Sequence, residues 1–363
     1  MTALEIGTAL DAPATTVGLD PRRFNRHTFW CGQSGSGKTY ALGVVLEQLL
    51  LHTDLPLLVL DPNADFVRMQ QTRASADAAS AERIAALDTR VFRSGQRGAD
   101  PLHVRYVDLS PASKAAVLQM DPIRDAEEYN VLLHSESLVQ RLNAPEMVST
   151  LRASGDPARV RLANRMENLQ VLDWNLWSWG TGSVIDAIDE RPRATVLDLG
   201  GFDHPDEPKV AALAVLEHLW ARREERRPVL IVIDEAHNLC SPDPRSEVEQ
   251  ALTERLIQIA AEGRKFGLWL FLSTQRPTKI HPNVLSQCDN LGLMRVNAPR
   301  DLAELAEVFG FAPEEAIQRA KTFRQGQALF AGGFIDAPTF VQMGDRLTEE
   351  AGGDVKVPLR AEA

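Results

Sequence analysis

The 363-residue sequence lacks several features that would place it in other classes of protein. Its three cysteines, Cys31, Cys240 and Cys288, include no C-x-x-C pair, so neither a disulfide framework nor a zinc site is expected. The N-terminus has no basic start and no apolar signal core, and the longest apolar runs are far too short to span a bilayer. We therefore expect a cytoplasmic protein with reduced, mostly buried thiols and no membrane contact.

Positive charge is also scarce. The chain carries 39 Lys and Arg against 50 Asp and Glu, for a formal net charge of -11 at pH 7. A surface that binds nucleic acid as a whole is normally basic, so any such contact has to come from a local basic patch or from a ring of subunits. No helix-turn-helix, zinc finger or other base-reading motif occurs in the sequence. Sequence-specific recognition of DNA is therefore not expected.

What the sequence does contain is an alternation of short apolar runs and helical stretches, in a chain that is 44% hydrophobic. The runs are apolar almost throughout, which is typical of strands buried on both faces of a parallel sheet. Strands are expected at Thr28–Cys31, Leu57–Leu60, Ala194–Leu199, Val229–Ile233, Leu268–Ser273 and Asn290–Val296. Helices are expected at Tyr40–Leu51, Pro208–Arg226, Ser246–Glu262 and Pro299–Phe309. This order predicts an α/β fold with a mostly parallel sheet flanked by helices.

Two regions depart from the alternation. Residues 71–88 are Ala-rich and polar, and are expected to form a surface helix or a mobile loop. Residues 123–180 have helical patterns without a strong strand signal and predict a helical insertion, whose Trp174, Trp177 and Trp179 we expect to be core or subunit-interface anchors. We expect the first part of the core at residues 1–122 and the insertion at 123–180. The second part of the core is expected at 181–345, and a flexible tail at 346–363.

One stretch carries the signature of a phosphate-binding loop. Gly32-Gln33-Ser34-Gly35-Ser36-Gly37-Lys38-Thr39 matches G-x-x-x-x-G-K-[ST] at every fixed position, after a strand-like run and before a helix. Such glycines let consecutive backbone N–H groups point at phosphates, and the helix N-terminus adds its positive dipole end. Lys38 is expected to reach the β- and γ-phosphates, and the Thr39 hydroxyl to bind Mg²⁺. ATP is therefore expected to lie on Gly32, Gln33, Ser34, Gly35, Ser36, Gly37, Lys38, Thr39 and Tyr40.

Polar side chains follow three of the other expected strands. Asp234 and Glu235 end the fourth of them, where Asp234 can anchor Mg²⁺ and Glu235 can polarise the attacking water. A pair of helix-capping carboxylates is the structural alternative. Gln275 ends a further strand and is expected to sense the γ-phosphate or to orient the water. Asp61 and Asp65 either support the metal or the nucleotide, or form a turn with local side-chain hydrogen bonds.

These motifs resemble those of the HerA-type, FtsK-like P-loop ATPases, a family of DNA translocases and helicases. The resemblance is carried by Asn25–Thr28, Asp61–Phe66, Ile233–His237, Gly263–Gly267 and Ser273–Pro277, and it continues through Ser286–Asn290 and Arg295. It implies a RecA-like P-loop NTPase core and a homohexameric ring, with ATP between subunits and double-stranded DNA passing through the centre. It also implies a nuclease or effector partner, in DNA processing or in anti-phage defence.

Further roles follow from the resemblance alone. Arg264 would be an arginine finger that reaches into the neighbouring subunit's site, and Arg26 would be a second charge stabiliser; surface arginines are the alternative. His27 and His237 are expected to pack or cap rather than to catalyse. The family usually carries an N-terminal β-barrel, and the roughly 25 residues before the P-loop strand are too few for one. Where the family's D-P-x-G-E-Y pattern has Gly-Glu, this sequence has Ala64-Asp65.

A basic loop follows the strand that ends near Gln275. In this loop Arg276 and Lys279 are expected to contact DNA phosphates without regard to sequence, and a solvated loop is the alternative. The first functional hypothesis is a translocase or helicase whose ATP hydrolysis is stimulated by DNA. The second is a regulatory or assembly ATPase that scaffolds and activates a partner effector without moving along DNA. A nucleotide kinase is disfavoured, because Glu235 suits the activation of water better than transfer to a second substrate.

Overall fold

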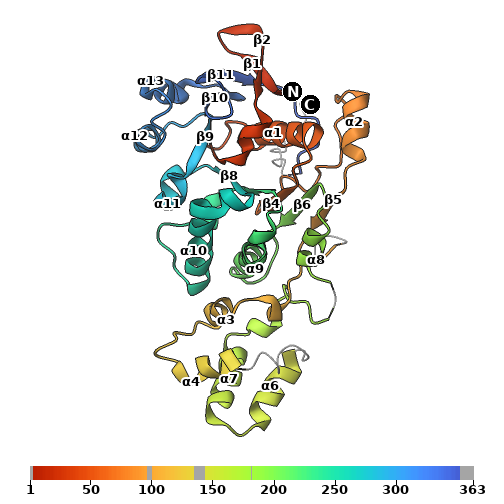
Figure 1. Ribbon diagram of the computed structural model, residues 1–363, viewed down its shortest axis with the longest axis vertical. Coiled ribbons are helices and arrows are strands. Elements are labelled where there is room, and N and C mark those ends of the chain that lie inside the picture. The colour runs from red at the N-terminus through yellow and green to blue at the C-terminus, as the bar shows by residue number, and fades with distance from the viewer. Residues whose placement is uncertain (1–2, 96–99, 135–143, 181, 352–363) are drawn as a thin grey trace, which may run out of the picture.

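One sheet of eleven strands runs through the molecule (Figure 1). The computed structural model describes residues 3–95, 100–134, 144–180 and 182–351. The strands are β1 Leu4–Ala9, β2 Ala12–Leu19, β3 His27–Cys31, β4 Leu57–Asp61, β5 Thr89–Phe92, β6 Ala194–Asp198, β7 Val229–Ile233, β8 Leu268–Thr274, β9 Cys288–Leu293, β10 Gln327–Gly332 and β11 Thr339–Met343. Their order across the sheet is β2-β1-β11-β10-β9-β3-β8-β7-β4-β6-β5.

The larger part of the sheet is parallel. Strands β9, β3, β8, β7, β4, β6 and β5 pair parallel with their neighbours. The other end, from β2 through β1, β11 and β10 to β9, is antiparallel. The expected α/β fold with a mostly parallel sheet is thereby confirmed. Parallel strands end at a common edge, so the segments that follow β3, β4, β7 and β8 lie together.

Helices cover both faces of the sheet. Within the described residues they are α1 Lys38–His52, α2 Ala78–Ala85, α3 Pro111–Val117, α4 Ala126–His134, α6 Ala144–Ala153, α7 Pro157–Asn168, α8 Val184–Asp189, α9 Glu207–Ala221, α10 Glu247–Glu262, α11 Pro282–Leu285, α12 Pro299–Val308 and α13 Glu314–Gln318. The core helices α1, α9 and α10 agree with the expected ones to within a few residues, apart from the C-terminal end of α9, which stops at Ala221 rather than at Arg226.

Buried side chains form two clusters, one on each face of the sheet, because successive residues of a strand point to opposite sides. In β7, Val229, Ile231 and Ile233 join the cluster that contains α9 and α10. Leu230 and Val232 join the cluster that contains α1. A strand covered on both faces has to be apolar throughout, which is why these strands could be predicted from their sequence.

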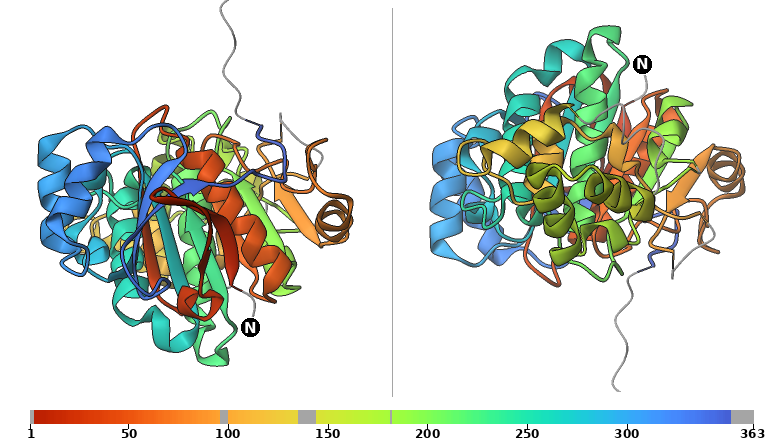
Figure 2. Two further views of the ribbon diagram at one scale, coloured as in Figure 1. Left: turned by 90° about the horizontal axis from the view of Figure 1, so that it is seen from above. Right: turned by 90° about the horizontal axis from the view of Figure 1, so that it is seen from below.

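The helical region forms a lobe at one end of the molecule, far from β1 and β2 (Figure 1). Helix α7 packs against both α4 and α6, and α3 joins the lobe to α10 of the core. Seen from below in Figure 2, these helices lie across the underside of the core. Trp177 is 4% exposed, and Trp174 stacks on both Trp177 and His204. These two indoles therefore anchor the lobe to the core.

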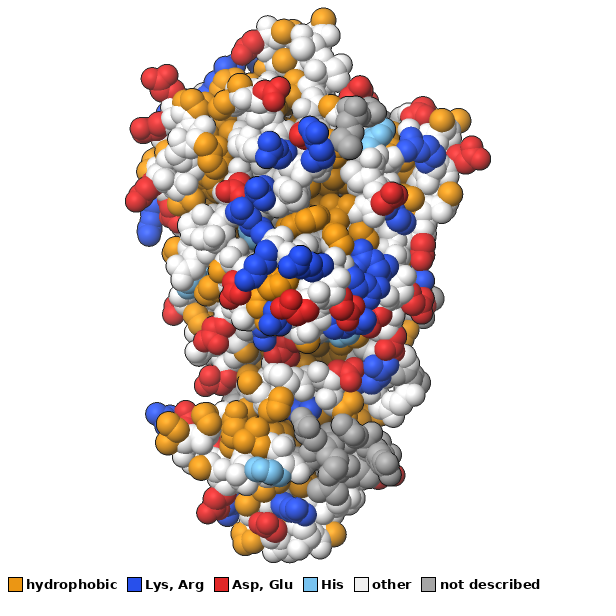
Figure 3. Space-filling model, in the orientation of Figure 1, with side chains coloured by type: hydrophobic (Ala, Val, Ile, Leu, Met, Phe, Trp, Pro, Cys, Tyr) orange, Lys and Arg blue, Asp and Glu red, His pale blue; other side chains and the backbone are white. Residues whose placement is uncertain are grey.

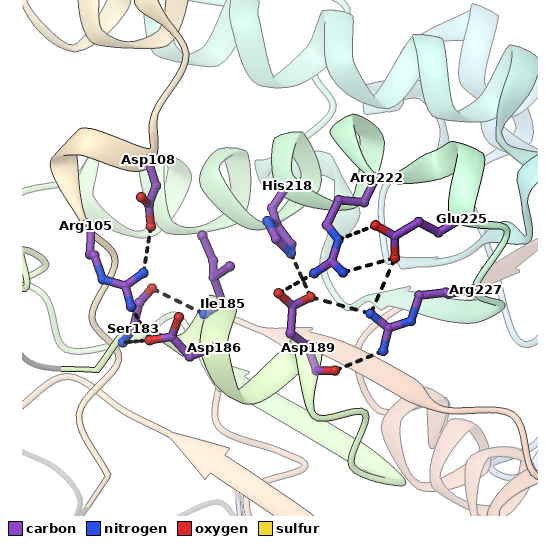
Figure 4. Close-up of polar contacts among 10 residues, drawn as sticks. All are labelled: Arg105, Asp108, Ser183, Ile185, Asp186, Asp189, His218, Arg222, Glu225 and Arg227. Atoms are coloured by element: carbon purple, nitrogen blue, oxygen red, sulfur yellow. Dashed lines mark hydrogen bonds and ion pairs between the residues drawn. The ribbon is translucent and has the colours of Figure 1, made fainter. Parts of the chain in front are cut away.

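Polar contacts fasten α8, which leads from the lobe back to the sheet (Figure 4). Arg105, from the connection into the lobe, pairs with Asp186 of α8. Asp189, the last residue of α8, pairs with His218 Nε2 at 2.9 Å and with Arg222, both near the C-terminal end of α9. The entry to the lobe and its exit are therefore both tied to the core through one short helix.

The sequence prediction missed β1, β2, β5, β10 and β11. Strand β2 shows the reason, since most of its residues are exposed and it has no continuous apolar run. Strand β5 is only half-buried along its whole length. Two predictions are refined by the structure. The strand expected at Asn290–Val296 is β9, Cys288–Leu293, and the region 71–88 contains the surface helix α2, whose Ile84 is buried. Strands β2 and β5 lie at the two edges of the sheet, where a strand depends on its partner strand and shows no continuous apolar run in the sequence.

The expectation of a flexible tail from residue 346 is wrong for the part of it that is described. Arg346 and Thr348 are each 1% exposed. Glu47 of α1 accepts hydrogen bonds from the backbone N–H groups of Leu347 at 2.8 Å and Thr348 at 2.9 Å. A polar segment that looks solvated in sequence is thus held against a buried glutamate. Residues 352–363 of the expected tail lie outside the described residues.

The three cysteines are free thiols and all are buried, as expected. Burial raises the pKa of each thiol well above its ordinary value, so they remain protonated and unreactive. Among the described residues, no helix is both long enough and apolar enough to cross a bilayer.

Candidate nucleotide-binding site

The loop between β3 and α1 has the backbone of a phosphate cradle. Gly35 and Gly37 have φ angles of +74° and +86°, in the left-handed region that glycine adopts without strain. At Gly32 a Cβ atom would lie 2.7 Å from the Ser36 hydroxyl oxygen and 2.8 Å from the Met294 Cβ, so no side chain fits. The loop then passes directly into α1, whose first residue is Lys38. Backbone N–H groups and a helix N-terminus are thereby brought to one place.

The loop opens onto a cavity of about 700 Å³, which is large enough for a nucleotide. Seven of the nine residues predicted to hold ATP line it, namely Gln33, Ser34, Gly35, Gly37, Lys38, Thr39 and Tyr40. The other two, Gly32 and Ser36, lie buried behind the loop. The opposite wall comes from Gln325, Gly326 and the segment from Gln342 to Glu350, which the sequence reading did not assign to the site.

Lys38 is almost fully buried and meets the end of the neighbouring strands. Its Nζ lies 2.7 Å from Asp234 Oδ1, 2.9 Å from Ser273 Oγ and 3.3 Å from Glu235 Oε1. The Ser273 hydroxyl in turn donates to Asp234 Oδ1 at 2.7 Å. Burial by itself lowers the pKa of Lys38, but the two carboxylates outweigh it and hold that pKa above its ordinary value. The lysine is therefore a charged group aimed at the cavity.

Glu235 is held as an ionised carboxylate. Gln275 Nε2 donates to its Oε1 at 2.7 Å, and His237 Nδ1 lies 3.3 Å from its Oε2. Burial alone would raise the pKa of Glu235, but the hydrogen bond from His237, the charge of Lys38 and the hydrogen bond from Gln275 lower it to about 2. Glu235 also has a φ angle of +44°, a conformation that few non-glycine residues adopt. It follows β7 without capping the next turn through its side chain.

Three carboxylates at this edge fit a divalent cation. Oxygen atoms of Asp61, Asp65 and Asp234 all lie within 4.8 Å of one another. Asp234 Oδ2 is buried and has no hydrogen-bond partner, which leaves an unsatisfied ligand atom in the cluster. Burial is the main cause that raises the pKa of Asp61 to about 7 and of Asp65 to about 6. Hard oxygen ligands of this kind suit Mg²⁺.

Asp61 forms the turn with local hydrogen bonds that was one of the two alternatives for this residue. Its carboxylate accepts hydrogen bonds from the backbone N–H groups of Asn63, Asp65 and Phe66, at 3.3, 3.1 and 2.8 Å. These bonds make it the organiser of the turn after β4. The same turn brings Asp65 to the cavity and to Asp234. Asp61 itself is completely buried and is not one of the residues that line the cavity.

Arg26 and Arg264 lie at the opposite edge of the sheet. Arg26 precedes β3 and Gly32 follows it, so about 20 Å of extended strand separates their backbones. Both arginines meet Asp289, with Arg264 Nη1 at 2.8 Å and Arg26 Nε at 3.6 Å from Asp289 Oδ2. Neither can reach the phosphate loop of its own subunit. They form instead a partly exposed pair of cations at the edge where the strands begin.

With this geometry in place, the comparison with known proteins is decisive. Residues 4–218 match the family described as "Helicase HerA, central domain", which is more than half of the chain.

The chain belongs to the HerA central-domain family.

Individual HerA proteins extend this match. The DNA double-strand break repair helicase HerA of Sulfurisphaera tokodaii is 29% identical over 182 residues, which is 48% of this chain and 36% of that protein. The HerA of Pyrococcus furiosus is 24% identical over 396 aligned residues, covering 94% of this chain and 69% of that protein. The match to the first of these relatives thus spans only about a third of its length.

Among solved structures, VirB4 of Thermoanaerobacter pseudethanolicus has a similar fold. It aligns with a TM-score of 0.63 at 14% identity, covering 94% of this chain and 96% of VirB4. At that identity the likeness concerns the fold alone. It agrees with a mostly parallel sheet that is flanked by helices.

In this HerA-family chain the predicted DNA-contacting residues lie on an exposed loop. Arg276 and Lys279 flank and end a short helical turn, Pro277–Lys279, directly after β8, and both are exposed. The backbone N–H of Arg276 donates to Thr274 Oγ1 at 3.0 Å. The loop therefore begins at the same strand end that carries Ser273 and Gln275.

Sequence reasoning missed two side chains of the site. Ser273 was quoted only as part of the family resemblance, yet it bonds both Lys38 and Asp234. His237 was expected to pack or cap, and it contacts Glu235 instead. Position at a strand end was the available signal for Ser273. His237 gave none, because its contact depends on the left-handed turn at Glu235. His27, by contrast, is a buried structural residue, as expected.

Proposed function

We propose that this chain hydrolyses ATP with Mg²⁺ and that a ring of its copies moves along or unwinds double-stranded DNA. The observation that carries the proposal is the meeting of Lys38 and Glu235 at 3.3 Å on one edge of a nucleotide-sized cavity. One group is a cation placed for phosphate, and the other is a carboxylate that stays ionised. Together they are what attack of water on a phosphoryl group requires.

Each side chain then has a task that its contacts support. When ATP enters, the loop N–H groups and Lys38 bind the phosphates, and Lys38 exchanges its carboxylate partners for phosphate oxygens. Glu235, released from Lys38, accepts a proton from the attacking water. Gln275, bonded to Glu235 Oε1, holds that carboxylate in line. Mg²⁺ on Thr39 and Asp234 would neutralise charge on the phosphates.

A ring is supported by the two edges of the sheet. Arg26 and Arg264 are too far from their own phosphate loop, and their charge suits the phosphates of a neighbour. Other cations gather at the same edge, where Arg191, Arg222, Arg223 and Arg227 line a hollow at the starts of β4, β7 and β8. Figure 3 shows Lys and Arg side chains gathered at mid-height on one face of this net-acidic molecule. Head-to-tail contact of a basic edge with an acidic edge forms a ring when the rotation between subunits closes.

DNA contact is assigned to the loop with Arg276 and Lys279. Such contacts would go to phosphates, so they would be indifferent to sequence and would weaken as salt rises. A nuclease or defence effector as partner stays a prediction that rests on the family resemblance. So does a scaffold role without movement along DNA.

The test is ATP hydrolysis by the purified protein with and without duplex DNA of unrelated sequences, over a range of salt. We expect stimulation by every duplex and loss of that stimulation at high salt. A joint Arg276→Ala and Lys279→Ala variant should lose stimulation, whereas Lys321→Ala, an exposed lysine elsewhere, should keep it. Hydrolysis that ignores DNA but responds to a protein partner would favour the scaffold role. Lys38→Ala protein that binds and turns over ATP like the parent would contradict the nucleotide site itself.

A further inference from the structure

The basic loop is attached at both ends to the segment that carries Glu235. At its start, the Arg276 backbone N–H donates to Thr274 Oγ1 at 3.0 Å, and the same oxygen lies 3.1 Å from His237 Nδ1. At its end, the His281 backbone N–H donates to the carbonyl oxygen of Cys240 at 3.0 Å. His237 and Cys240 both lie within the short stretch after Glu235. A displacement of the loop therefore acts on this stretch at two points.

His237 is the link that reaches the carboxylate. Its Nδ1 lies 3.3 Å from Glu235 Oε2, while Glu235 Oε1 is bonded by Gln275. Gln275 itself directly precedes the basic loop. Glu235 Oε1 is therefore hydrogen-bonded, whereas Oε2 has no hydrogen-bond partner and only the close contact with His237. The Glu235 side chain is 7% exposed, so water does not replace these partners freely.

The position of His237 Nδ1 makes the link specific. Its hydrogen bond is to Thr274 Oγ1 at 3.1 Å, and the same hydroxyl oxygen accepts the Arg276 N–H. Glu235 Oε2 lies 3.3 Å from Nδ1 and has no hydrogen-bond partner of its own. Movement of Thr274 or of Arg276 therefore moves the ring that packs against Oε2, and with it the orientation of Glu235.

We infer that His237 is a positioning residue that couples the basic loop to Glu235, so that contact of the loop with the DNA sugar–phosphate backbone changes the rate of ATP hydrolysis. This inference rests on the proposed function and deepens it. In the structure Lys38 and Gln275 hold Glu235 Oε1, and His237 lies against Oε2, which is buried and has no hydrogen-bond partner. Activation of water needs this oxygen to face the cavity. Loop contact with phosphates shifts His237 and lets the carboxylate turn toward the water.

The experiment measures the ratio of ATP turnover with saturating duplex DNA to turnover without it. For His237→Ala we expect this ratio to fall by about fivefold or more, the size of an ordinary coupling between two sites. His237→Asn keeps a side-chain N–H in roughly the place of Nδ1 and should recover most of the ratio. The KM for ATP and the affinity for DNA, measured separately, should stay near those of the parent.

A second pair of variants tests the link through a residue that does not contact Glu235. Thr274→Val removes the hydroxyl at nearly constant volume, whereas Thr274→Ser keeps it. We expect Thr274→Val to lower the DNA-stimulation ratio as His237→Ala does, and Thr274→Ser to keep it. Equal ratios for the two Thr274 variants would overturn the inference even if His237→Ala folded poorly.

The possible outcomes separate this inference from the function beneath it. A parent protein whose hydrolysis is indifferent to DNA contradicts both the motor and the coupling. A parent that is stimulated, with His237→Ala stimulated to the same ratio, contradicts the coupling alone. A His237→Ala protein that loses DNA binding or ATP binding in proportion to its loss of stimulation shows a structural role, which also overturns the inference.

Discussion

At the scale of single residues, the site depends on a backbone conformation that its residue type does not favour. Glu235 has a φ angle of +44°, and its side chain would be accommodated with less strain on an extended strand. The turn is maintained by contacts from Lys38, Gln275 and His237 to the carboxylate. Strain of this kind is common where a side chain has to be aimed at a ligand. The Glu235 side chain makes no capping hydrogen bond, and this geometry is consistent with the chemical task that we propose for it.

The first prediction concerns that task. Glu235→Gln keeps the shape of the side chain but removes its ability to accept a proton, so kcat for ATP hydrolysis should fall by about 10²–10⁴-fold. ATP affinity should change little, because Lys38 and the loop remain. Nucleotide binding and turnover are measured on the same preparation. Asp345→Asn, which alters another carboxylate lining the cavity, is the matched control and should lose far less. Unchanged turnover in Glu235→Gln would refute the assignment.

His27 provides a test by pH. Its Nδ1 accepts from the Leu270 N–H at 2.9 Å and its Nε2 donates to the Ala260 carbonyl at 3.0 Å, so the folded state needs the neutral ring. Burial, opposed by the Ala260 bond and reinforced by the charges of Arg264 and Arg26, lowers the pKa of His27 to about 4. The unfolded chain keeps a pKa near 6.5 and therefore binds the proton first as pH falls.

The second prediction follows from that sign. The contribution of His27 to stability is complete above pH 6.5 and is lost as the pH falls from about 6.5 to about 4, with a size of about 3 kcal/mol. The free energy of unfolding by urea, measured across this range, should fall more steeply for the parent than for His27→Gln. The carboxylates of the rest of the chain cancel in that difference. Parallel curves would show that His27 titrates normally in the folded protein.

At the scale of elements, the segment from Gly344 to Glu350 connects α1 to the nucleotide cavity. It crosses α1, where Arg346 Nε lies 3.5 Å from Glu47 Oε1 and the Arg346 backbone N–H donates to the Tyr40 hydroxyl oxygen at 2.8 Å. Tyr40 and Asp345 both line the nucleotide cavity. This segment from Gly344 to Glu350, which we call the strap, therefore joins the start of α1 to the part of the cavity wall that contains Asp345.

The third prediction tests how firmly this strap is held. Arg346→Ala leaves Glu47 buried without its positive partner, so the free energy of unfolding should fall by about 3–5 kcal/mol. Arg319→Ala, which removes an arginine paired with Asp11 at the exposed surface, should cost about 1 kcal/mol or less. Urea denaturation of the two variants gives the comparison directly. Equal losses would mean that the strap does not depend on Arg346.

At the scale of the whole molecule, parallel pairing separates the charges by the direction of the strands. Carboxylates and the phosphate loop lie where β3, β4 and β7 end, and arginines lie where β3 and β8 begin. Under the proposed function, a single subunit would hold half of a site at each edge. A second copy, turned head to tail, would then bring Arg264 to the phosphates.

The fourth prediction uses that separation. Arg264→Ala rings should hydrolyse ATP about 10³-fold more slowly or worse, while each subunit still binds nucleotide. Lys38→Ala rings should be inactive because they do not bind it. When the two inactive variants are mixed and allowed to exchange subunits, activity should return, because an Arg264 from one faces an intact loop of the other. No recovery on mixing, with exchange shown independently, would place Arg264 outside the active site.

Some of this protein could be predicted from its sequence alone. The buried parallel strands and the phosphate loop were readable because each depends on a local pattern: continuous apolar runs for a strand covered on both faces, and glycines before Lys38 for the loop. The antiparallel strands β1, β2 and β11 were not, because a partly exposed strand has no continuous apolar run and depends on its partners. Strand β10 was missed although it is buried on both faces. The contribution of residues 344–350 was missed for a similar reason, since their polar groups are satisfied by residues distant in the chain, among them Glu47 and Tyr40.

The sequence by itself determined the chemistry that is available: a loop for phosphate, a lysine, carboxylates at strand ends and a family to which they belong. Only the tertiary structure decided which of these groups face one another. Parallel strands set 200 residues apart share one edge, and this brings Lys38 to Asp234 and Ser273 and carries Arg26 and Arg264 to the other edge. Contacts between residues so distant in the chain follow from strand order, which no local pattern of residues encodes.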